Sequence, residues 1–486
     1  MKRILFTLAI LGLFASGRSQ TNYFISDFVS DTAFKHAGIS VCLRDAQTGD
    51  ILAGYNENMA LSSASLMKLV TTAVSLEMMG PGHKFETHIG YAGILDMSTG
   101  LLKGHIIIRG GGDPTLGSEY LEIDRDEILQ RWANALVRAG IRKVEGRVIA
   151  DASIFDYHPA ASGWEWADLG NYYAAGPHGL SFSDNMYRIH FKTGVAGSRP
   201  ELAGFDPEIP GLILDNQLTA QANRDNGYVY LAPYQSEGVI RGTIPAYRED
   251  FTLKASIPDP PLFTAELLHN ELIRSGIEIK DPPTTMRLYR TYIPDTLIFL
   301  ATLCNTISSP ALEEIITLTN KESINLYAEH LARLTALFYT GGEHASLSLG
   351  IETIQNFLSH NGLNTSGLYQ TDGSGLSRSN ALSSAFVTSL LHYMKDKSSY
   401  PDVFQASLPK AGEEGTLEYY FRDPLFSNNL RAKSGTSTRI RNYAGYFSTT
   451  GGKEIVFAVL VNNFDCSSDE VTGRIEILLR KIIENY

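Results

Sequence analysis

The sequence predicts an α+β protein in which a large β-rich insert interrupts one main domain. Strand and helix patterns follow each other near the N-terminus, strand patterns dominate residues 88–257, and helical periodicity returns after Pro258, before a final strand pair and helix. At 486 residues the chain exceeds the length at which one hydrophobic core stops growing, so we expect at least two domains. We assign residues 20–87 and 258–486 to the main domain and expect a smaller domain nested in the insert near residues 190–250.

The first residues have the pattern of a secretory signal peptide. Lys2 and Arg3 precede an apolar stretch from Ile4 to Ala15, and small residues follow. This stretch is shorter than the roughly 20 apolar residues that span a bilayer. We therefore expect residues 1–19 to be removed on export, and a periplasmic or cell-envelope location for the mature chain.

Charge and cysteine content exclude several classes of function. The formal net charge is −12, and it becomes more negative when the basic residues of the signal peptide are lost. Such a surface repels nucleic acid, while a peripheral association with a membrane stays open. The 3 cysteines are far apart and lack the spacing of metal ligands, so we expect no disulfide framework and no metal site.

The elements of the main domain can be placed from periodicity. Residues 38–55 have the pattern of a β-hairpin, and from Ser65 apolar residues recur at helical spacing until Gly80 and Pro81. Ser65 is therefore expected at the N-terminus of a helix that follows a sheet. Further helices are predicted at 127–139, 263–275, 320–339, 347–360 and 469–484, and further strands at 104–109, 442–448 and 454–462.

Ser65 and Lys68 form the first motif with chemical meaning. A serine hydroxyl is a weak nucleophile at neutral pH unless a base takes its proton. Residues three apart on a helix share a face, so Lys68 can serve Ser65 as that base. Taken alone, the pattern also fits a helix-capping serine followed by a solvated lysine. The spacing recurs at Ser407 and Lys410, where Pro409 disfavours a helix, and we interpret that copy as a loop.

Enzymes with a Ser-x-x-Lys pair carry Ser-x-Asn and Lys-Ser/Thr-Gly on other walls of the cleft. Ser183-Asp184-Asn185 and Lys192-Thr193-Gly194 match literally, but only residues 186–191 separate them. One short strand cannot supply two walls, because its side chains alternate between faces. We therefore interpret both matches as structural.

A second pair of matches has the expected order and context. Ser323-Ile324-Asn325 opens an amphipathic helix, and Lys433-Ser434-Gly435-Thr436 precedes the final strands and helix. Each match alone also fits a structural role: Ser323 could be a helix-capping serine, and Lys433 a solvated lysine on a strand. The three motifs together favour a single site.

With these motifs the chain resembles the low-molecular-mass penicillin-binding proteins of class C, which are D-alanyl-D-alanine carboxypeptidases and endopeptidases. The resemblance extends over the mature chain, with Ser434 where the family more often has Thr, and includes Gly110–Pro114, Asp372–Arg378 with Asn380, and Leu408–Leu417. It implies the penicillin-binding, serine β-lactamase-like transpeptidase fold, an antiparallel sheet flanked by helices with an all-helical subdomain, and no cofactor.

The resemblance also implies roles for individual residues. Ser65 would attack the penultimate D-Ala carbonyl, Lys68 would take its proton, and Ser323 would relay it to the leaving amine. Asn325 would hold Lys68 and the substrate amide, and the N–H groups of Ser65 and Thr436 would form the oxyanion hole. The remaining expected residues are Lys433, Ser434, Gly435 and Thr436 for the terminal carboxylate, and Asp168, with Tyr173 and Arg378, for the free amine of the stem peptide.

The implied partners are peptidoglycan stem peptides as substrates and β-lactams as covalent inhibitors. Two alternatives share the fold. A β-lactamase would deacylate fast, and a non-catalytic peptidoglycan-binding protein would lack a catalytic residue. For Asp168, a helix cap beside core aromatic residues is the alternative to a substrate contact.

Overall fold

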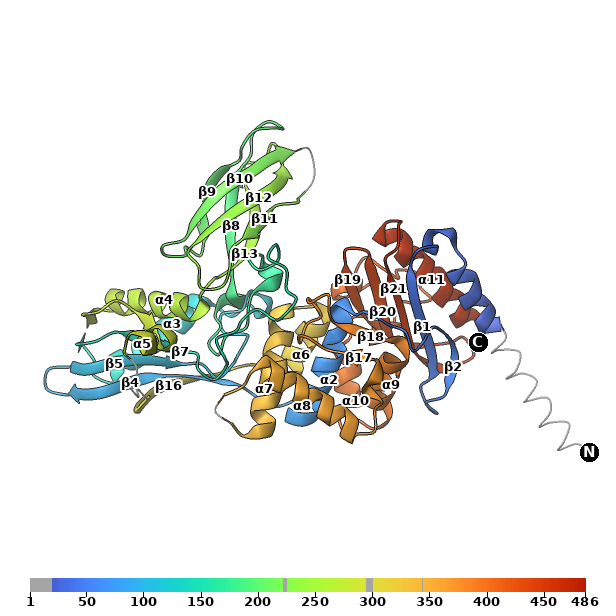
Figure 1. Cartoon of the computed structure of the whole chain (residues 1–486). Coiled ribbons are helices and arrows are strands. Elements are labelled where there is room, and N and C mark those ends of the chain that lie inside the picture. Colours follow the sequence, from blue (N-terminus) through green and yellow to red (C-terminus); the bar gives the residue numbers. More distant parts are fainter. Residues whose placement is uncertain (1–19, 222–224, 294–299, 343) are drawn as a thin grey trace, which may run out of the picture. The chain divides into compact units, whose positions relative to one another are not determined.

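The computed structural model describes residues 20–221, 225–293, 300–342 and 344–486 (Figure 1). The chain forms two compact units. Unit 1 comprises Met1–Gly82, Leu312–Ile324 and Ile351–Tyr486, and unit 2 comprises His83–Ala311 and Asn325–Gly350. Residues 258–311, which the sequence placed in the main domain, fold with unit 2. The predicted signal peptide at residues 1–19 lies outside the described residues.

Unit 1 is built on a five-stranded antiparallel sheet with the strand order β19-β20-β21-β1-β2. Its central contact joins the two ends of the chain, because Gly38 of β1 pairs with Asn462 of β21. The predicted hairpin and the predicted final strand pair are both confirmed. The strands are β1 (Gly38–Asp45), β2 (Ile51–Tyr55), β19 (Arg431–Ser437), β20 (Ile440–Ser448) and β21 (Glu454–Asn462).

Helices cover both faces of this sheet. Val41 and Leu43 of β1 belong to the same hydrophobic cluster as residues of α11 (Ser468–Asn485), the predicted C-terminal helix. Cys42 lies between them in sequence and accepts a hydrogen bond from Thr388 of α9 (Ser384–Asp396). Because side chains alternate along a strand, α11 and α9 pack on opposite faces.

The helical part of unit 1 surrounds α2 (Met67–Met79), whose side chains are buried almost all around. The Asn320 side chain donates hydrogen bonds to Thr72 of α2 and to Ser407, which ties α2 to two neighbouring helices. Those neighbours are α6 (Leu312–Lys321) and α10 (Pro401–Ser407), and α8 (Leu347–His360) follows its predicted bounds. A small sheet of β3 (Ala60–Ser62), β18 (Ala381–Ser383) and β17 (Leu368–Tyr369) completes the unit.

The predicted helix at 320–339 is wrong at its start. Helix α6 ends at Lys321, and a separate helix, α7 (Asn325–Thr340), begins four residues later. Ser323 lies between them with φ at +60°, in the left-handed region, which breaks the α-helical hydrogen-bond ladder. Apolar spacing continues through this break, so periodicity could not reveal it.

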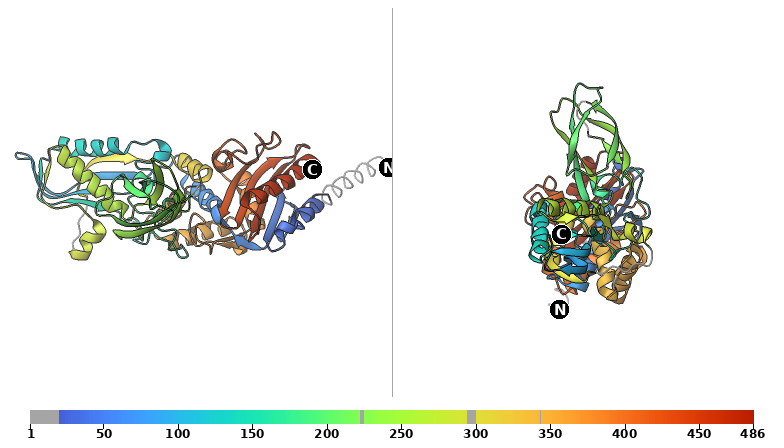
Figure 2. Two further views of the ribbon diagram at one scale, coloured as in Figure 1. Left: turned by 90° about the horizontal axis from the view of Figure 1, so that it is seen from above. Right: turned by 90° about the vertical axis from the view of Figure 1, so that its left-hand side faces the viewer.

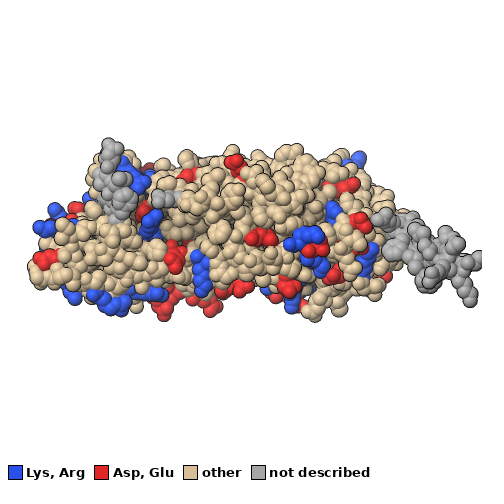
Figure 3. Space-filling view, turned by 90° about the horizontal axis from the view of Figure 1, so that it is seen from below, with Lys and Arg blue, Asp and Glu red and all other residues tan. Residues whose placement is uncertain are grey.

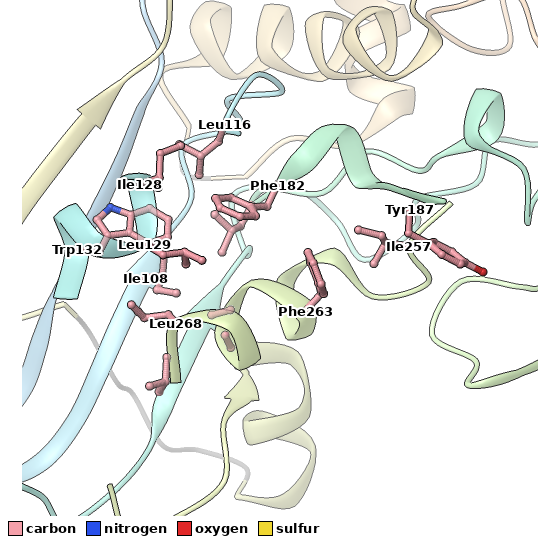
Figure 4. Close-up of a cluster of buried hydrophobic side chains, with 14 of the residues drawn as sticks. Ile108, Leu116, Ile128, Leu129, Trp132, Phe182, Tyr187, Ile257, Phe263 and Leu268 are labelled. Atoms are coloured by element: carbon pink, nitrogen blue, oxygen red, sulfur yellow. The ribbon is translucent and has the colours of Figure 1, made fainter. Parts of the chain in front are cut away.

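Unit 2 has a seven-stranded sheet centred on the hairpin of β4 (Glu86–Asp96) and β5 (Leu101–Arg109). Helices α3 (Arg125–Arg138) and α4 (Pro260–Arg274) pack side by side against it (Figure 2). Trp132, Phe182 and Phe263 lie in the core between them (Figure 4). The other elements here are β6 (Lys143–Val144), β7 (Val148–Asp151), β14 (Glu278–Ile279), β15 (Thr284–Thr285), β16 (Thr302–Ser308) and α5 (Met286–Tyr292).

The remaining strands of unit 2 form two three-stranded sheets, in the region where the sequence predicted a nested domain. The first has the order β10-β12-β11 and the second β13-β8-β9. The strands are β8 (Met186–Lys192), β9 (Glu201–Asp206), β10 (Ile213–Gln221), β11 (Tyr228–Tyr230), β12 (Glu237–Pro245) and β13 (Phe251–Ser256).

Helix α7 is anchored in unit 2 by a buried histidine. His330 Nδ1 lies 2.8 Å from Gly112 O, and a carbonyl can only accept, so Nδ1 carries the proton. Nε2 then accepts from Ser181 Oγ, 3.0 Å away. Burial lowers the pKa of His330 to about 3, so the ring stays neutral near pH 7. This contact holds Asn325, the first residue of α7, relative to the Gly-rich segment around Gly112.

Acidic and basic side chains are mixed on the face drawn in Figure 3, where neither sign gathers into one patch. Within the described ranges, we find no helix with both the length and the apolar character needed to cross a bilayer.

Candidate active site

The nucleophile candidate lies in the short 3₁₀ turn, Ala64–Leu66, that leads into α2. Lys68 Nζ donates to Ser65 Oγ at 3.0 Å and to Ser374 O at 2.9 Å. Lys68 is fully buried, whereas Ser65 is partly exposed. The structure therefore contains the predicted pairing of Ser65 with Lys68 near a helix N-terminus, and the Lys68 amine is shielded from solvent.

A glycine loop brings the Ser374 carbonyl to Lys68. A β-carbon at Gly375 would lie 1.8 Å from Ala64 O, so only glycine permits this approach. The buried Asp372 carboxylate holds the loop, because it accepts from the backbone N–H groups of Gly375 and Ser377. The loop thus fixes the second partner of the Lys68 amine.

The backbone immediately before Ser65 is itself strained. Ala64 has φ at +42°, in the left-handed region that non-glycine residues rarely adopt. Such a conformation costs on the order of 1 kcal/mol and persists only where the surroundings impose it. Here the imposed turn places the Ser65 side chain beside the Lys68 amine.

A second lysine and serine face each other in the same unit. Lys433 Nζ donates to Ser323 Oγ and to Ser434 O, both at 2.9 Å. Lys433 is fully buried, and burial, followed by the charge of Lys68, lowers its pKa well below the ordinary value. The left-handed backbone of Ser323 is thus the feature that turns its hydroxyl to β19 rather than into a helix cap.

Strands β19 and β20, the first of which carries Lys433, pack against the segment just before Ser65. The side chain of Asn442, on β20, donates to Ser62 O at 2.9 Å and to Ser63 O at 3.1 Å. A β-carbon at Gly435 would lie 2.7 Å from Ser63 O, which explains the glycine of the Lys-Ser-Gly motif. On the other face of β19, Ser434 Oγ donates to Thr416 Oγ1 at 2.9 Å.

The residues predicted to select the substrate belong in part to unit 2. There, Asn325 Nδ2 donates to Tyr173 O at 2.7 Å, and the Tyr173 hydroxyl donates to Asp168 Oδ1 at 2.9 Å. Burial, followed by the Asp168 charge, raises the pKa of Tyr173. Arg378, the third residue predicted for the stem-peptide amine, is an exposed residue of unit 1.

The literal motif copies have structural contacts instead. Lys192 pairs with Glu249 at 2.7 Å at the end of β8, and the Asn185 side chain donates to Gly176 O at 2.9 Å and to Ser181 Oγ at 2.9 Å. Ser407 is buried and donates to Phe404 O, while Lys410 lies 3.7 Å from Glu413. Ser407 is the last residue of α10, so the loop predicted for this copy begins only after it. The chain leaves the helix before Lys410, and the two side chains therefore have different partners.

Several residues of the site were not singled out from the sequence. Ser374 and Thr416 lie within segments on which the resemblance depends, and that context was the available signal. Asn442 and Arg441 carried no such signal, because their roles come from the register of β20 against β19.

Comparisons with known proteins identify relatives of the whole chain. The chain resembles the D-alanyl-D-alanine carboxypeptidase DacB of Haemophilus influenzae, with 24% identity over 442 residues, 88% of this chain and 86% of that protein. It also resembles a D-alanyl-D-alanine carboxypeptidase of an Actinomadura species, with 27% identity over 452 residues, 90% of this chain and 80% of that protein.

A solved structure shows the fold. The crystal structure of penicillin-binding protein 4 (dacB) from Haemophilus influenzae matches with a TM-score of 0.78 and 22% identity, over 94% of this chain and 97% of that one. The predicted fold class is therefore confirmed. The model of the D-Ala-D-Ala carboxypeptidase 3 (S13) family matches residues 22–482, so the chain belongs to this family of serine peptidases.

Proposed function

We propose that Ser65 is the residue of this serine-type D-alanyl-D-alanine carboxypeptidase/endopeptidase that receives the acyl group of the substrate during turnover, with Lys68 as its base. The hydrogen bond of 3.0 Å between Lys68 Nζ and Ser65 Oγ carries this proposal. A base within hydrogen-bond reach can take the hydroxyl proton as the bond to carbon forms. Ser374 O, as a second acceptor, keeps the amine pointed at Ser65.

The reaction then runs in two steps. Ser65 Oγ bonds to the carbonyl carbon of the penultimate D-Ala, its proton passes to Lys68, and the backbone N–H groups of Ser65 and Thr436 stabilise the oxyanion. The carbon–nitrogen bond breaks, and the leaving amine receives a proton through Ser323. Water then attacks the ester, returns a proton to Ser65 and releases the shortened stem peptide.

The positive charge of Lys433 affects the protonation of Lys68, and its amine positions Ser323. Lys433 and Lys68 repel each other when both are protonated, which favours a neutral amine on one of them. In our proposal the Lys433 side chain keeps the Ser323 hydroxyl oriented for the proton relay, and Ser434, Gly435 and Thr436 bind the substrate carboxylate beside it. Asn325 binds the substrate amide.

The test is to locate the acyl group that benzylpenicillin leaves on the enzyme. A β-lactam mimics the D-Ala-D-Ala bond, so its ring opens on the nucleophile and stalls as an ester. We expect peptide mass spectrometry to find one adduct, on the peptide that contains Ser65, while the peptide with Ser407 stays unmodified. An adduct elsewhere would refute the assignment, and sustained nitrocefin hydrolysis in place of a single burst would indicate a β-lactamase.

We also propose that Asp168 binds the free amine of the stem peptide. Its carboxylate already accepts from Tyr173, which in turn is tied to Asn325 through the backbone. In this proposal the substrates are peptidoglycan stem peptides, which carry both a free side-chain amine and a D-Ala-D-Ala terminus. The signal-peptide pattern supports export of the chain to the periplasm.

For Asp168→Asn we expect kcat/KM to fall roughly 10- to 100-fold for a peptide with a free side-chain amine, the range for losing a charged hydrogen bond. A peptide whose side-chain amine is blocked should change less than about threefold, since it cannot form that bond. Asp215→Asn is the control, because Asp215 is an exposed residue of β10 that pairs with Arg199. Equal losses for both peptides would mean that Asp168 is structural.

A further inference from the structure

The geometry points to Arg441 as a specificity-determining residue: it positions Thr436 and adds a positive charge for the C-terminal carboxylate of the substrate. The inference rests on the proposed function, because it assigns a residue of the same site that the family motifs do not include. Arg441 lies on β20, one strand away from the Lys-Ser-Gly-Thr segment.

The register of the sheet places Arg441 beside Thr436. These two residues are paired directly between β20 and β19, so their side chains share one face of the sheet. Arg441 Nη1 donates to Thr436 Oγ1 at 2.7 Å. Ser434 is two residues earlier on β19 and therefore has its hydroxyl on the same face. This face thus carries two hydroxyl groups and one guanidinium group.

The donation by Arg441 determines what Thr436 can do. A threonine hydroxyl has one proton, and because its oxygen already accepts from Nη1, that proton is left to donate to a ligand. Thr436 is exposed, so a carboxylate can reach it. In this way the guanidinium orients the hydroxyl toward an anion as well as attracting the anion by charge.

The guanidinium itself is held rigidly. Nε donates to Thr472 Oγ1 of α11 at 2.8 Å, and the group stacks on Tyr420, with 4.5 Å between the guanidinium carbon and the ring centroid. Tyr443 contacts it as well, at 5.4 Å. Arg441 is only 6% exposed, so a ligand meets a group that is already ordered.

The direct contacts of Arg441 are hydroxyl groups and aromatic rings. Among the residues that the structure describes, no aspartate or glutamate forms an ion pair with Arg441. Its Nη2 is buried and has no hydrogen-bond partner among the described residues. Buried charges are normally paired, and an anionic ligand at Thr436 would supply the missing negative charge. A carboxylate is the anion that a peptide ending in D-Ala brings there.

The experiment compares two peptides that differ in this carboxylate alone. One ends in D-Ala-D-Ala with a free carboxylate, and the other ends in the corresponding amide. For Arg441→Gln we expect kcat/KM for the carboxylate peptide to fall about 10- to 100-fold, mainly through KM, and less than about threefold for the amide. Arg441→Lys, which keeps the charge, should recover part of the loss. Arg439→Gln is the matched control, because Arg439 pairs with Asp465 at 2.5 Å at the turn after β19.

A double-variant cycle tests the route through Thr436. Thr436→Val should remove the same preference for the carboxylate, and Arg441→Gln added to it should cost little more, since the two act as one unit. Equal losses for both peptides, or no loss, would overturn the inference. If Arg441→Gln does not fold, Thr436→Val alone gives the same comparison of the two peptides, since it removes the hydroxyl that Arg441 orients. Failure of the proposed function is seen separately, as absence of a Ser65 adduct in the unmodified enzyme.

Discussion

Replacement of Ser65 by alanine is expected to end turnover. The hydroxyl is the atom that bonds to the substrate in our proposal, so Ser65→Ala should lower kcat/KM by about 10⁴-fold or more, leaving only what binding and the oxyanion hole supply. The change removes one partly exposed hydroxyl from the 3₁₀ turn and should leave the fold intact. Release of D-alanine from a stem pentapeptide and labelling by a fluorescent penicillin measure the two consequences.

Ser407→Ala provides the matched control for this variant. Ser407 stands in the same Ser-x-x-Lys spacing, but its hydroxyl donates to Phe404 O and accepts from Asn320. Its loss should lower the unfolding temperature and leave penicillin labelling unchanged. If Ser65→Ala retained labelling while Ser407→Ala lost it, the nucleophile would have been assigned to the wrong motif.

Replacement of Lys68 by methionine is expected to slow acylation by about 10²- to 10⁴-fold, the contribution typical of a positioned general base. The unbranched methionine chain fills the buried site, and the change removes a buried amine, so we expect no loss in the free energy of unfolding. The measurement is the pseudo-first-order rate of acylation by benzylpenicillin, followed over a range of concentrations.

Lys410→Met is the corresponding control. Lys410 is the lysine of the second Ser-x-x-Lys copy, and its amine lies near Glu413 at the surface. A surface ion pair contributes about 1 kcal/mol at most, so acylation should proceed at the original rate. Unchanged acylation in Lys68→Met would show that another group, with Lys433 the nearest candidate, takes the proton.

Much of unit 1 could be predicted because its elements have clear periodicity and strong stop signals. The hairpin at 38–55, the helix ended by Gly80 and Pro81, and the final strands and helix are all confirmed. The exception is the helix predicted at 320–339. The helix is interrupted because Ser323 has a left-handed backbone conformation. The spacing of apolar residues, on which the prediction rested, does not depend on that conformation.

The literal motif copies show why the position of a motif along the chain was a better guide than an exact sequence match. Ser183–Asn185 and Lys192–Gly194 match the motifs letter for letter, yet one short strand, β8, lies between them. The structure places Lys192 in an ion pair and Asn185 in a buried hydrogen-bond network. Separation along the chain and alternation within a strand were enough to set them aside.

Contacts that depend on cross-strand register could not be predicted. Arg441 and Asn442 are neighbours in sequence, but they point to opposite faces of β20, one to Thr436 and the other to Ser62. A shift of one residue in the pairing of β19 with β20 would exchange their roles. The sequence alone gives no value for that register, and the burial of Lys68 and Lys433 is equally a property of the assembled fold.

The pairing of Gly38 with Asn462 has a consequence for how the enzyme is made. The sheet that packs against the turn of Ser65 needs β1 from the first segment of the chain and β21 from the last, so it cannot close until nearly the whole chain is available to fold. Contacts this distant in sequence form slowly, after a large loss of chain entropy. Residues 83–311, by contrast, form one contiguous segment of unit 2, whose sheets need no strand from the end of the chain. A chain truncated before β21 would therefore lack the strand that joins β1 to β20, and we expect it to leave Ser65 without the sheet that holds its turn.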